Sequence, residues 1–330
     1  MISILIVAFE SGTTLGRCLG ALSAQTFRDF EIVLVDNGSS DRAPQLAAEA
    51  DVGLVLISAG ANIGFAAGNN LAANRAQGEW LALLNPDAYA DPDWLEKLVE
   101  AASRWPQISS FASLQKAANR PGRLDGAGDV LTLSGFPYRG GYGHNLIDLP
   151  EGEVFSACGA AHFIRRDLFL ALGGFDERFF CYCEDVDLGY RMRLIGETTL
   201  FVPDAVVSHV GSAVMGPRSE FALYHGARNR FWLLIKNTPW PLAPLVGLLH
   251  LPVLALMLVI HGLRGEASSV LRGIWAAIVG MGPICISRRP VQARRSVGSL
   301  AILIALASNP LALLRRSAHI RPLVNRKAKP

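Results

Sequence analysis

Residues 1–38, MISILIVAFESGTTLGRCLGALSAQTFRDFEIVLVDNG, decide the fold of this chain. Within them, residues 2–8 and 31–35 are short apolar runs rich in β-branched residues, a composition typical of buried strands. Between the two runs, the polar residues from Ser11 to Thr14 can cap a helix over residues 14–25. A strand, a helix and a second buried strand in this order predict one unit of a parallel sheet.

The same alternation continues as far as residue 105. A helix begins at Asp41, and we expect a third strand at 52–57 and a fourth at 80–84. The glycine-rich stretch NIGFAAGNN, residues 62–70, leads into the helix between those two strands. Repeated strand and helix pairs predict an α/β fold, with a mostly parallel sheet flanked by helices on both faces.

Polar residues follow three of these strands, namely Asp36, Asn62 and Asp87. Ligands of parallel α/β sheets bind in the crevice outside the carboxyl ends of the strands. We therefore expect these three residues to face the same crevice.

The second half of the chain is less regular. Residues 115–150 are rich in Gly, Pro and Arg and indicate a long loop or an irregular hairpin, a kind of segment that is often functional. Beyond it, the pattern predicts strands at 153–164, 198–202 and 203–208, and helices at 166–172, 184–195 and 219–237.

The composition excludes several classes of protein. Of the 330 residues, 51% are apolar and 18% charged, which excludes a disordered chain and provides a core that needs no disulfide or metal. The net charge of +3 excludes a strongly basic nucleic-acid binder. The five cysteines form neither a zinc pattern nor a disulfide framework, so we expect reduced thiols in the cytosol. Glu10 interrupts the first apolar run, so we do not expect this run to be a signal peptide.

The C-terminal part differs from the rest. Residues 264–330 contain twelve Lys and Arg and one acidic residue, while residues 237–263 contain no Lys, Arg, Asp or Glu. Apolar helices bordered by arginines are typical of segments at a membrane surface. We therefore expect a boundary between residues 237 and 238, followed by an apolar, helical membrane-associating region, with a true span at 242–263 as the alternative. Aromatic stacking residues are not interleaved with these charges, so nucleic acid is not an expected partner.

Five motifs in order carry a family resemblance: VDNGSSD from residue 35, NIGFAAGNN from 62, LLNPDA from 83, FDERFFCYCEDVDLGYR from 175 and SHVG from 208. Over residues 1–237 the chain resembles family 2 glycosyltransferases with the GT-A fold, and among them the bacterial rhamnosyltransferases. This resemblance implies an inverting, metal-dependent transferase. Its donor would be a dTDP- or UDP-linked sugar, with rhamnose favoured.

The resemblance also implies the acceptor and the location. The acceptor would be a polyprenyl-linked glycan or a polysaccharide in cell-surface glycan assembly. The enzyme would lie on the cytoplasmic face of the plasma membrane, against the membrane surface, through peripheral or re-entrant anchoring.

A divalent cation is expected at Asp87. Its carboxylate follows a buried strand, where it can hold Mg²⁺ or Mn²⁺ against a phosphate. In the resembled family this is an Asp-x-Asp motif, whose first acid is replaced here by Asn85, a residue that can ligate through its carbonyl or through water. The resemblance adds His209 as a second metal ligand. The alternatives are a simple Asn-Pro-Asp turn and a structural histidine.

By resemblance, Asp185 is the catalytic base, and Glu184 orients the acceptor or lines the pocket. The alternative for Asp185 is an acid at a helix N-terminus, favoured by the helix dipole. Asp187 precedes Arg191 by four residues, a spacing that predicts a structural ion pair.

The remaining candidates concern the donor. Asp36 can accept the N3–H of a uracil or thymine ring, and an Asx turn with Gly38 is the alternative. Glycines permit close approach of the backbone to the ribose and diphosphate. Two of the candidates named next have structural alternatives. Gly159 can instead serve tight packing between a strand and a helix, and Arg228 can instead form a surface salt bridge. The other donor-site candidates are Ala8, Phe9 and Glu10 around the ring, Asn62, Gly64, Gly68 and Asn69 beneath the ribose and diphosphate, Gly159 beside the sugar and Arg228 near the diphosphate.

Three other classes are weaker. A dinucleotide-binding protein would need G-x-G-x-x-G, which is absent. A nucleotidyltransferase would need Lys or Arg after the first strand, where residues 8–16 read AFESGTTLG. A non-catalytic membrane scaffold of the same fold is favoured by Asn85 but disfavoured by Asp87, Asp185 and His209.

Overall fold

The computed structural model describes residues 1–50, 53–211, 219–309 and 311–323. Its first part confirms the predicted alternation of strands and helices. Residue 52, predicted to begin the third strand, lies outside the described residues. The elements are β1 (Ile2–Ala8), α1 (Gly12–Ser23), β2 (Phe30–Asp36), α2 (Ala43–Ala50), β3 (Val55–Ser58), α3 (Gly64–Arg75) and β4 (Trp80–Leu84).

The second part adds shorter strands and longer helices. The segment expected to be a loop or irregular hairpin contains three short strands, of which β8 and β9 form an antiparallel hairpin. The elements are β5 (Ala88–Ala90), α4 (Trp94–Arg104), β6 (Ser110–Ala117), β7 (Leu124–Ala127), β8 (Asp129–Leu131), β9 (Pro137–Arg139), β10 (Gly152–Val154), β11 (Ala161–Arg165), α5 (Arg166–Ala171), α6 (Glu184–Leu194), β12 (Thr199–His209) and α7 (Glu220–Asn237).

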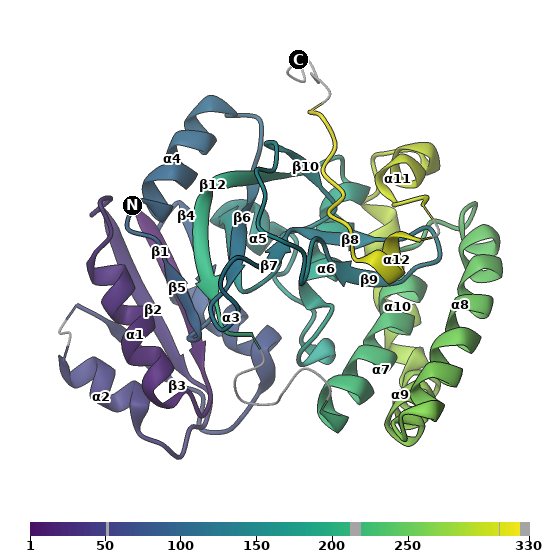
Figure 1. The fold of residues 1–330 in the computed structure, drawn as a ribbon, viewed down its shortest axis with the longest axis horizontal. Helices are drawn as coiled ribbons and strands as arrows, with labels where there is room; N and C mark the ends of the chain where they lie inside the picture. Colours follow the sequence, from purple (N-terminus) through teal and green to yellow (C-terminus); the bar gives the residue numbers. More distant parts are fainter. Residues whose placement is uncertain (51–52, 212–218, 310, 324–330) are drawn as a thin grey trace.

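One large sheet organises the molecule (Figure 1), with the strand order β10-β12-β6-β11-β4-β1-β2-β3. The four strands expected to be parallel pair in parallel, as β3-β2-β1-β4. The second half joins them through β11, which lies antiparallel between β4 and β6. The two strands predicted at 198–202 and 203–208 form the single strand β12, whose pairing with β6 shifts register between Val202 and Val206. Pro203 lies in this irregularity, where a missing N–H is tolerated.

Helices cover both faces of the sheet. Apolar residues of α1 and α4 pack on one face, and those of α3, α5 and α6 pack on the other. Gly68 permits the close approach of α3 to β1, because a Cβ added there would lie 2.7 Å from Cγ1 of Val7. The helices α1, α2 and α3 follow the parallel strands β1, β2 and β3, so their N-termini lie toward the carboxyl ends of those strands, whereas α5 begins beside Trp80 at the other end of β4.

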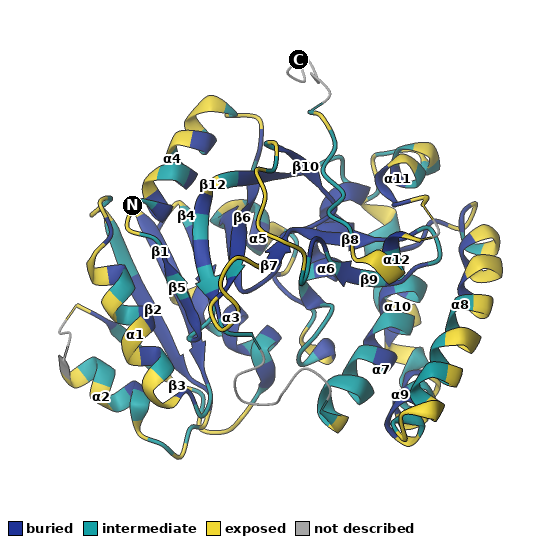
Figure 2. Ribbon diagram, in the orientation of Figure 1, coloured by how far each residue is buried: buried dark blue, intermediate teal, exposed yellow. Residues whose placement is uncertain are grey.

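The C-terminal helices are α8 (Ala243–Leu263), α9 (Ala267–Val279), α10 (Met281–Ala293), α11 (Ser299–Ala305) and α12 (Ala312–Arg315). α9 and α10 pack against α7, α8 packs against α9, and Trp232, Leu242, Val246 and Ile284 belong to one apolar cluster. Their outward faces are largely exposed, as Figure 2 shows for α8. Within the described residues, α8 is long and apolar enough to cross a membrane, with 21 residues and a mean hydropathy of 2.4. The helices α9 and α10 reach the length and apolarity needed to cross a membrane only when they are counted as one segment, and a bend of 62° separates them.

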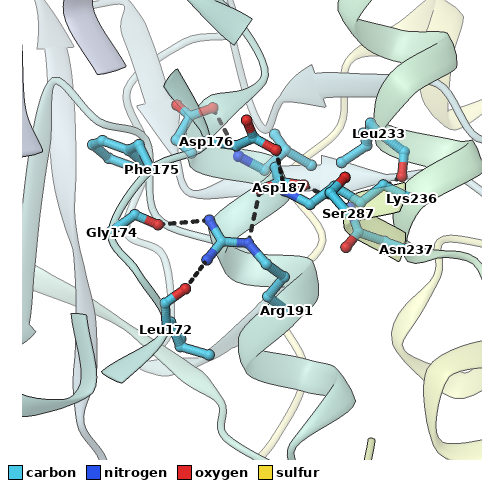
Figure 3. A network of polar contacts seen from close by, with 12 residues as sticks. Leu172, Gly174, Phe175, Asp176, Asp187, Arg191, Leu233, Lys236, Asn237 and Ser287 are labelled. Atoms are coloured by element: carbon cyan, nitrogen blue, oxygen red, sulfur yellow. Dashed lines mark hydrogen bonds and ion pairs between the residues drawn. The ribbon is translucent and has the colours of Figure 1, made fainter. Parts of the chain in front are cut away.

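A buried ion network joins α6 to α7 (Figure 3). The predicted pair of Asp187 and Arg191 is confirmed at 2.8 Å. Lys236 Nζ lies 2.9 Å from Asp187 and 2.7 Å from Asp176. Asn237 Nδ2 donates to the second oxygen of Asp187 at 2.7 Å. Both oxygens of the buried Asp187 therefore have partners, as a charge without water requires.

Candidate active site

Two adjoining cavities lie at the carboxyl ends of the strands. We call them the Asp87 cavity, of about 250 Å³, and the Asp185 cavity, of about 310 Å³, after one lining residue of each. The first extends over the ends of β1 and β4, and the second lies between the N-terminus of α6, the β8–β9 hairpin and α7. Both are lined by Phe65, Asn85, Arg139, Cys181 and Tyr182, so one group of side chains forms the boundary between them.

Asp87 and His209 meet in the Asp87 cavity. Asp87 Oδ1 lies 3.2 Å from His209 Nε2, although 122 residues of chain separate them, because β5 pairs antiparallel with the end of β12. The amide of Gly211 donates to the other carboxylate oxygen at 3.2 Å. Burial alone would raise the pKa of Asp87, but its interactions with His209 lower it, so the ionised form is favoured.

Asn85 completes this group. Its Nδ2 lies 3.4 Å from His209 Nε2, and its buried Oδ1 has no hydrogen-bond partner among the residues that the structure describes. A buried polar atom without a partner is costly unless a ligand satisfies it. A carboxylate, an imidazole and an amide oxygen together suit Mn²⁺ or Mg²⁺, so the residues present fit the implied cation.

Asp125 supports His209 from behind, and no sequence motif indicated this residue. His209 Nδ1 lies 2.7 Å from Asp125 Oδ2, and Arg139 pairs with the same carboxylate. Burial alone would lower the pKa of His209, but its hydrogen bonds with Asp125 and Asp87 raise it. A carboxylate on the far nitrogen fixes the tautomer and ring orientation of a metal-binding histidine. Asp125 lies in the irregular segment 115–150. The sequence pattern around it predicts a loop or hairpin there and does not indicate a contact with His209.

Asp185 lies at the N-terminus of α6 and lines the Asp185 cavity. Its Oδ2 accepts a hydrogen bond from the amide of Gly159 at 3.0 Å, and its Oδ1 accepts one from Val186 at 2.8 Å. Gly159 also leaves room for Phe65, whose Cε1 would lie 3.0 Å from an added Cβ. The carboxylate is therefore held by two backbone donors at the edge of the cavity.

Other ionisable groups surround Asp185. Ligand atoms of Asp129, Cys158 and Asp185 lie within 4.8 Å of one another. Burial, and then the charge of Asp185, raise the pKa of Asp129 and that of Glu184. Burial also raises the pKa of the Cys158 thiol. The neutral forms of these three neighbours are favoured, and a neutral thiol is a poor ligand for Mg²⁺ or Mn²⁺. The Asp87 group is the better cation site.

The loop before α6 has an unusual backbone. Phe180, Tyr182 and Cys183 have φ values of 65°, 72° and 67°, a region that non-glycine residues rarely adopt. Asn229 of α7 holds this loop, because its buried Nδ2 donates to the carbonyls of Phe179, Cys181 and Tyr182 at 2.9, 2.9 and 2.7 Å. Strain of this kind persists only where the surroundings enforce it. Asn229 therefore positions the loop that leads to Asp185, and the sequence analysis did not single it out.

The structure brings part of the predicted donor site together. Phe9, Asn62, Gly64, Asn85, Asp87 and His209 line the Asp87 cavity, and Asn85, Gly159, Glu184 and Asp185 line the other. Asn62 and Asp87, which follow two predicted strands, thus face one crevice as expected. Asp36 lines neither cavity, whereas its neighbour Asn37 lines the first.

The other predicted donor residues lie outside both linings. Asp36 accepts hydrogen bonds from the amide of Ser39 at 2.9 Å and from Gln45 at 2.7 Å, so the Asx-turn alternative describes its contacts. Glu10 accepts from the amide of Ser40 at 2.9 Å. The buried Asn69 donates to the carbonyl of Phe65 at 2.9 Å. Ala8 is fully buried. Gly38 and Gly68 are closely packed, because a Cβ added to either glycine would lie less than 3.0 Å from a neighbouring atom.

Arg228 also lies outside the cavities. Its guanidinium donates to the carbonyls of Arg178 and Phe179 and lies 4.4 Å from the centroid of the Trp232 ring. Two residues later along α7, Arg230 lines the Asp185 cavity and lies 4.4 Å from the centroid of Phe136. Of these two arginines, Arg230 is therefore the one that lines a cavity.

Comparison with known proteins identifies the family. The sequence profile described as Glycosyl transferase family 2 matches residues 3–173, more than half of the chain. The N-acetylglucosaminyl-diphospho-decaprenol L-rhamnosyltransferase of Mycobacterium tuberculosis is 31% identical over 270 residues, covering 74% of this chain and 88% of that protein. Rhamnosyltransferase WbbL of Escherichia coli is 26% identical, covering 62% of this chain and 81% of WbbL. The chain therefore belongs to glycosyltransferase family 2, and it is a glycosyltransferase.

Solved structures confirm the GT-A fold. The mannosyltransferase PcManGT of Pyrobaculum calidifontis, in complex with GDP-Man and Mn²⁺, has a TM-score of 0.54 at 17% identity and covers 91% of this chain and 86% of its own. The structure of GalNAc-T7 with UDP, GalNAc and Mn²⁺ has a TM-score of 0.57 at 18% identity, covering 72% of this chain and 48% of that one.

Proposed function

We propose that this protein is an inverting, metal-dependent glycosyltransferase. It transfers a sugar from a nucleoside-diphosphate donor to a polyprenyl-linked glycan or a polysaccharide at the cytoplasmic face of the plasma membrane. The observation that carries the proposal is the pair of adjoining cavities, with Asp87 and His209 in one and Asp185 in the other. The boundary that they share supports a mechanism in which the transferred group lies between a cation site and a base.

The names of the relatives support the donor and the acceptor. Two of them are rhamnosyltransferases, and one acts on an N-acetylglucosaminyl-diphospho-decaprenol acceptor. We infer a dTDP- or UDP-linked donor, with rhamnose favoured. The donor nucleotide lies over Phe9 and Asn62 in the Asp87 cavity, and the acceptor hydroxyl enters the Asp185 cavity. In this proposal, the strands, turns and helix around the donor are supported by residues that do not line the cavity, namely Ala8, Glu10, Asp36, Gly38, Gly68 and Asn69.

Asp185 performs the proton transfer in this mechanism. Its carboxylate takes the proton of the acceptor hydroxyl while the hydroxyl oxygen forms a bond with the anomeric carbon and the bond to the leaving diphosphate breaks on the opposite face. Attack from that face inverts the anomeric configuration. The amides of Gly159 and Val186 hold the carboxylate in one orientation.

Asp87 and His209, with Asn85 Oδ1, would hold Mn²⁺ or Mg²⁺. When bound, the cation supplies positive charge that stabilises the leaving diphosphate. Asp125 orients His209, as its hydrogen bond to Nδ1 requires.

Residues 238–330 form the membrane-associating region in this proposal. The length and apolarity of α8 support it, as do the exposed apolar side chains of α9 and α10. A location at the membrane surface suits a transferase whose acceptor is held in the bilayer.

The test is the variant Asp185→Asn, assayed with dTDP-rhamnose and polyprenyl-diphosphate-linked N-acetylglucosamine in the presence of Mn²⁺. We expect loss of transfer with dTDP binding retained, because the amide keeps the shape but not the basicity of the carboxylate. Asp204→Asn, at an exposed position of β12, is the matched control and should keep full activity. Normal turnover by Asp185→Asn would remove the assignment.

A catalytically inactive scaffold is the second candidate, favoured by Asn85 at the position of an acid. A scaffold should neither transfer nor hydrolyse a nucleotide sugar. Metal-dependent turnover of dTDP-rhamnose or of a UDP-sugar therefore excludes it.

A further inference from the structure

A third cavity lies away from the transfer site, between α7, α8 and α10. We call it the α8 groove; its volume is about 840 Å³. It shares no lining residue with the Asp87 or Asp185 cavity. Its walls are mainly apolar, with polar groups from Thr238, Trp240, His250, Arg288, Arg289 and Gln292.

Arg288 gives the groove a positive charge that the protein satisfies only in part. The side chain is 8% exposed, and its Nη1 donates to the carbonyl of Ile235 at 2.6 Å. Its Nη2 is buried and has no hydrogen-bond partner among the described residues. The guanidinium lies 4.3 Å from the centroid of the Trp240 ring, and Arg289 follows it on the same lining. Both arginines line the groove, and guanidinium groups are suited to a phosphate.

His250 supplies a second unsatisfied atom. The ring is 4% exposed, and its Nδ1 lies 2.8 Å from the carbonyl of Ser134 and donates to it. The Nε2 atom is buried and has no partner within the described part of the chain. Two buried polar atoms on one apolar lining indicate a cavity built for a ligand with both polar and apolar parts.

The groove opens on the apolar face of the C-terminal helices. Leu251 of α8 and Ile286 of α10 line the groove and are also 65% and 68% exposed, so its wall continues into the outer surface. Exposed apolar residues extend this surface along α8 and α9, including Leu248, Leu256, Val259, Leu263, Leu271 and Trp275. A face of this kind, with Trp and Arg at its edge, is typical of a membrane interface. A lipid chain can therefore enter the groove from the side.

We propose that the α8 groove binds one anionic phospholipid of the membrane. The phosphate of its headgroup lies on Arg288 and Arg289, and one acyl chain lies along Val246, Gly247 and Leu251. This site goes beyond the proposed transfer reaction. A bilayer lipid is favoured over the acceptor lipid, because the acceptor sugar must reach Asp185 in a cavity that the groove does not join.

Gly247 offers a direct way to fill the groove. It lines the cavity within α8, and a Cβ added there would meet no atom within 4 Å. Gly247→Phe therefore places a ring in the groove without a clash at Cβ. Gly262→Phe is the matched control, since Gly262 lies in the same helix with equally open space and does not line the groove.

The experiment uses the full chain, stripped of lipid in nonionic detergent, and native mass spectrometry with added dioleoylphosphatidylglycerol. We expect one bound molecule per chain for the natural protein and for Gly262→Phe, and at least ten-fold weaker binding for Gly247→Phe. Arg289→Ala should also bind phosphatidylglycerol about ten-fold more weakly than its control Arg315→Ala, which changes an arginine outside the groove. This second pair of variants provides the test if Gly247→Phe does not fold.

Three results would overturn the proposal. One is equal binding of phosphatidylglycerol by Gly247→Phe and Gly262→Phe, or by Arg289→Ala and Arg315→Ala when Gly247→Phe does not fold. Another is that the natural protein binds an uncharged diacylglycerol as tightly as it binds phosphatidylglycerol. The third is displacement of phosphatidylglycerol by a lower concentration of undecaprenyl diphosphate, which would assign the groove to the acceptor lipid.

Discussion

Replacing Lys236 by Met tests whether the buried ion network holds α6 against α7. The Nζ atom of Lys236 lies 2.7 Å from Asp176 and 2.9 Å from Asp187, and the lysine side chain is nearly inaccessible to water. Removing one partner of a buried pair costs about 3–5 kcal/mol. Since Arg178 and Arg191 each remain beside one of the carboxylates, we expect a loss of about 3 kcal/mol in the free energy of unfolding, at the lower end of that range.

The loss should depend on pH with a definite sign. Burial alone would raise the pKa of both carboxyls, but Arg178 and Lys236 lower that of Asp176, and Lys236 and Arg191 lower that of Asp187. A carboxyl with a lowered folded-state pKa stabilises the protein above its unfolded value of about 3.9, and this contribution is lost as the pH falls through the folded value. The difference between the natural protein and Lys236→Met should therefore be constant from pH 7 to pH 5 and shrink below pH 4.

Urea unfolding followed by tryptophan fluorescence at several pH values measures this difference. Lys97→Met is the control, because Lys97 pairs with Glu100 on the surface of α4 and its loss should leave the midpoint unchanged. The reasoning is refuted if Lys236→Met unfolds at the same urea concentration as Lys97→Met at pH 7. A difference that grows below pH 4 would refute the assigned sign.

Three further variants test the site. Asn229→Ala removes three hydrogen bonds from the strained loop, so we expect about 1–3 kcal/mol of lost stability by urea unfolding and a larger fall in transfer than in dTDP binding; equal falls would contradict its positioning role. Asp125→Asn should weaken Mn²⁺ binding in the presence of dTDP about 10–100-fold, measured by electron paramagnetic resonance, because His209 loses its orienting carboxylate; an unchanged affinity would contradict this. Gly64→Ala places a Cβ 2.6 Å from the Phe180 ring at a φ of +89°, so dTDP binding measured by calorimetry should fall, and retention of natural affinity would contradict that expectation.

The sequence alone determined the architecture of the first half of the chain and part of the site. Buried strands and helices in alternation predict a parallel sheet, because each helix carries the chain back to the end of the sheet at which the preceding strand began. The polar residues at the strand ends then converge, which is why Asn62 and Asp87 could be placed in one crevice. The spacing of Asp187 and Arg191 likewise predicted a pair that depends only on helical geometry.

Tertiary structure decided how the side chains are used. Asp125 reaches His209 across 84 positions because β7 and β12 flank β6, and no local period reports such a contact. Asn229 contacts a loop nearly 50 residues earlier because α7 packs against α6, the helix that this loop precedes. Asp36 and Arg228 have chemistry that suits a nucleotide sugar, yet neighbouring protein groups satisfy both side chains. Local sequence establishes which polar groups lie at a strand end or on a helix, whereas their partners depend on which distant segments the packed core brings within hydrogen-bond distance.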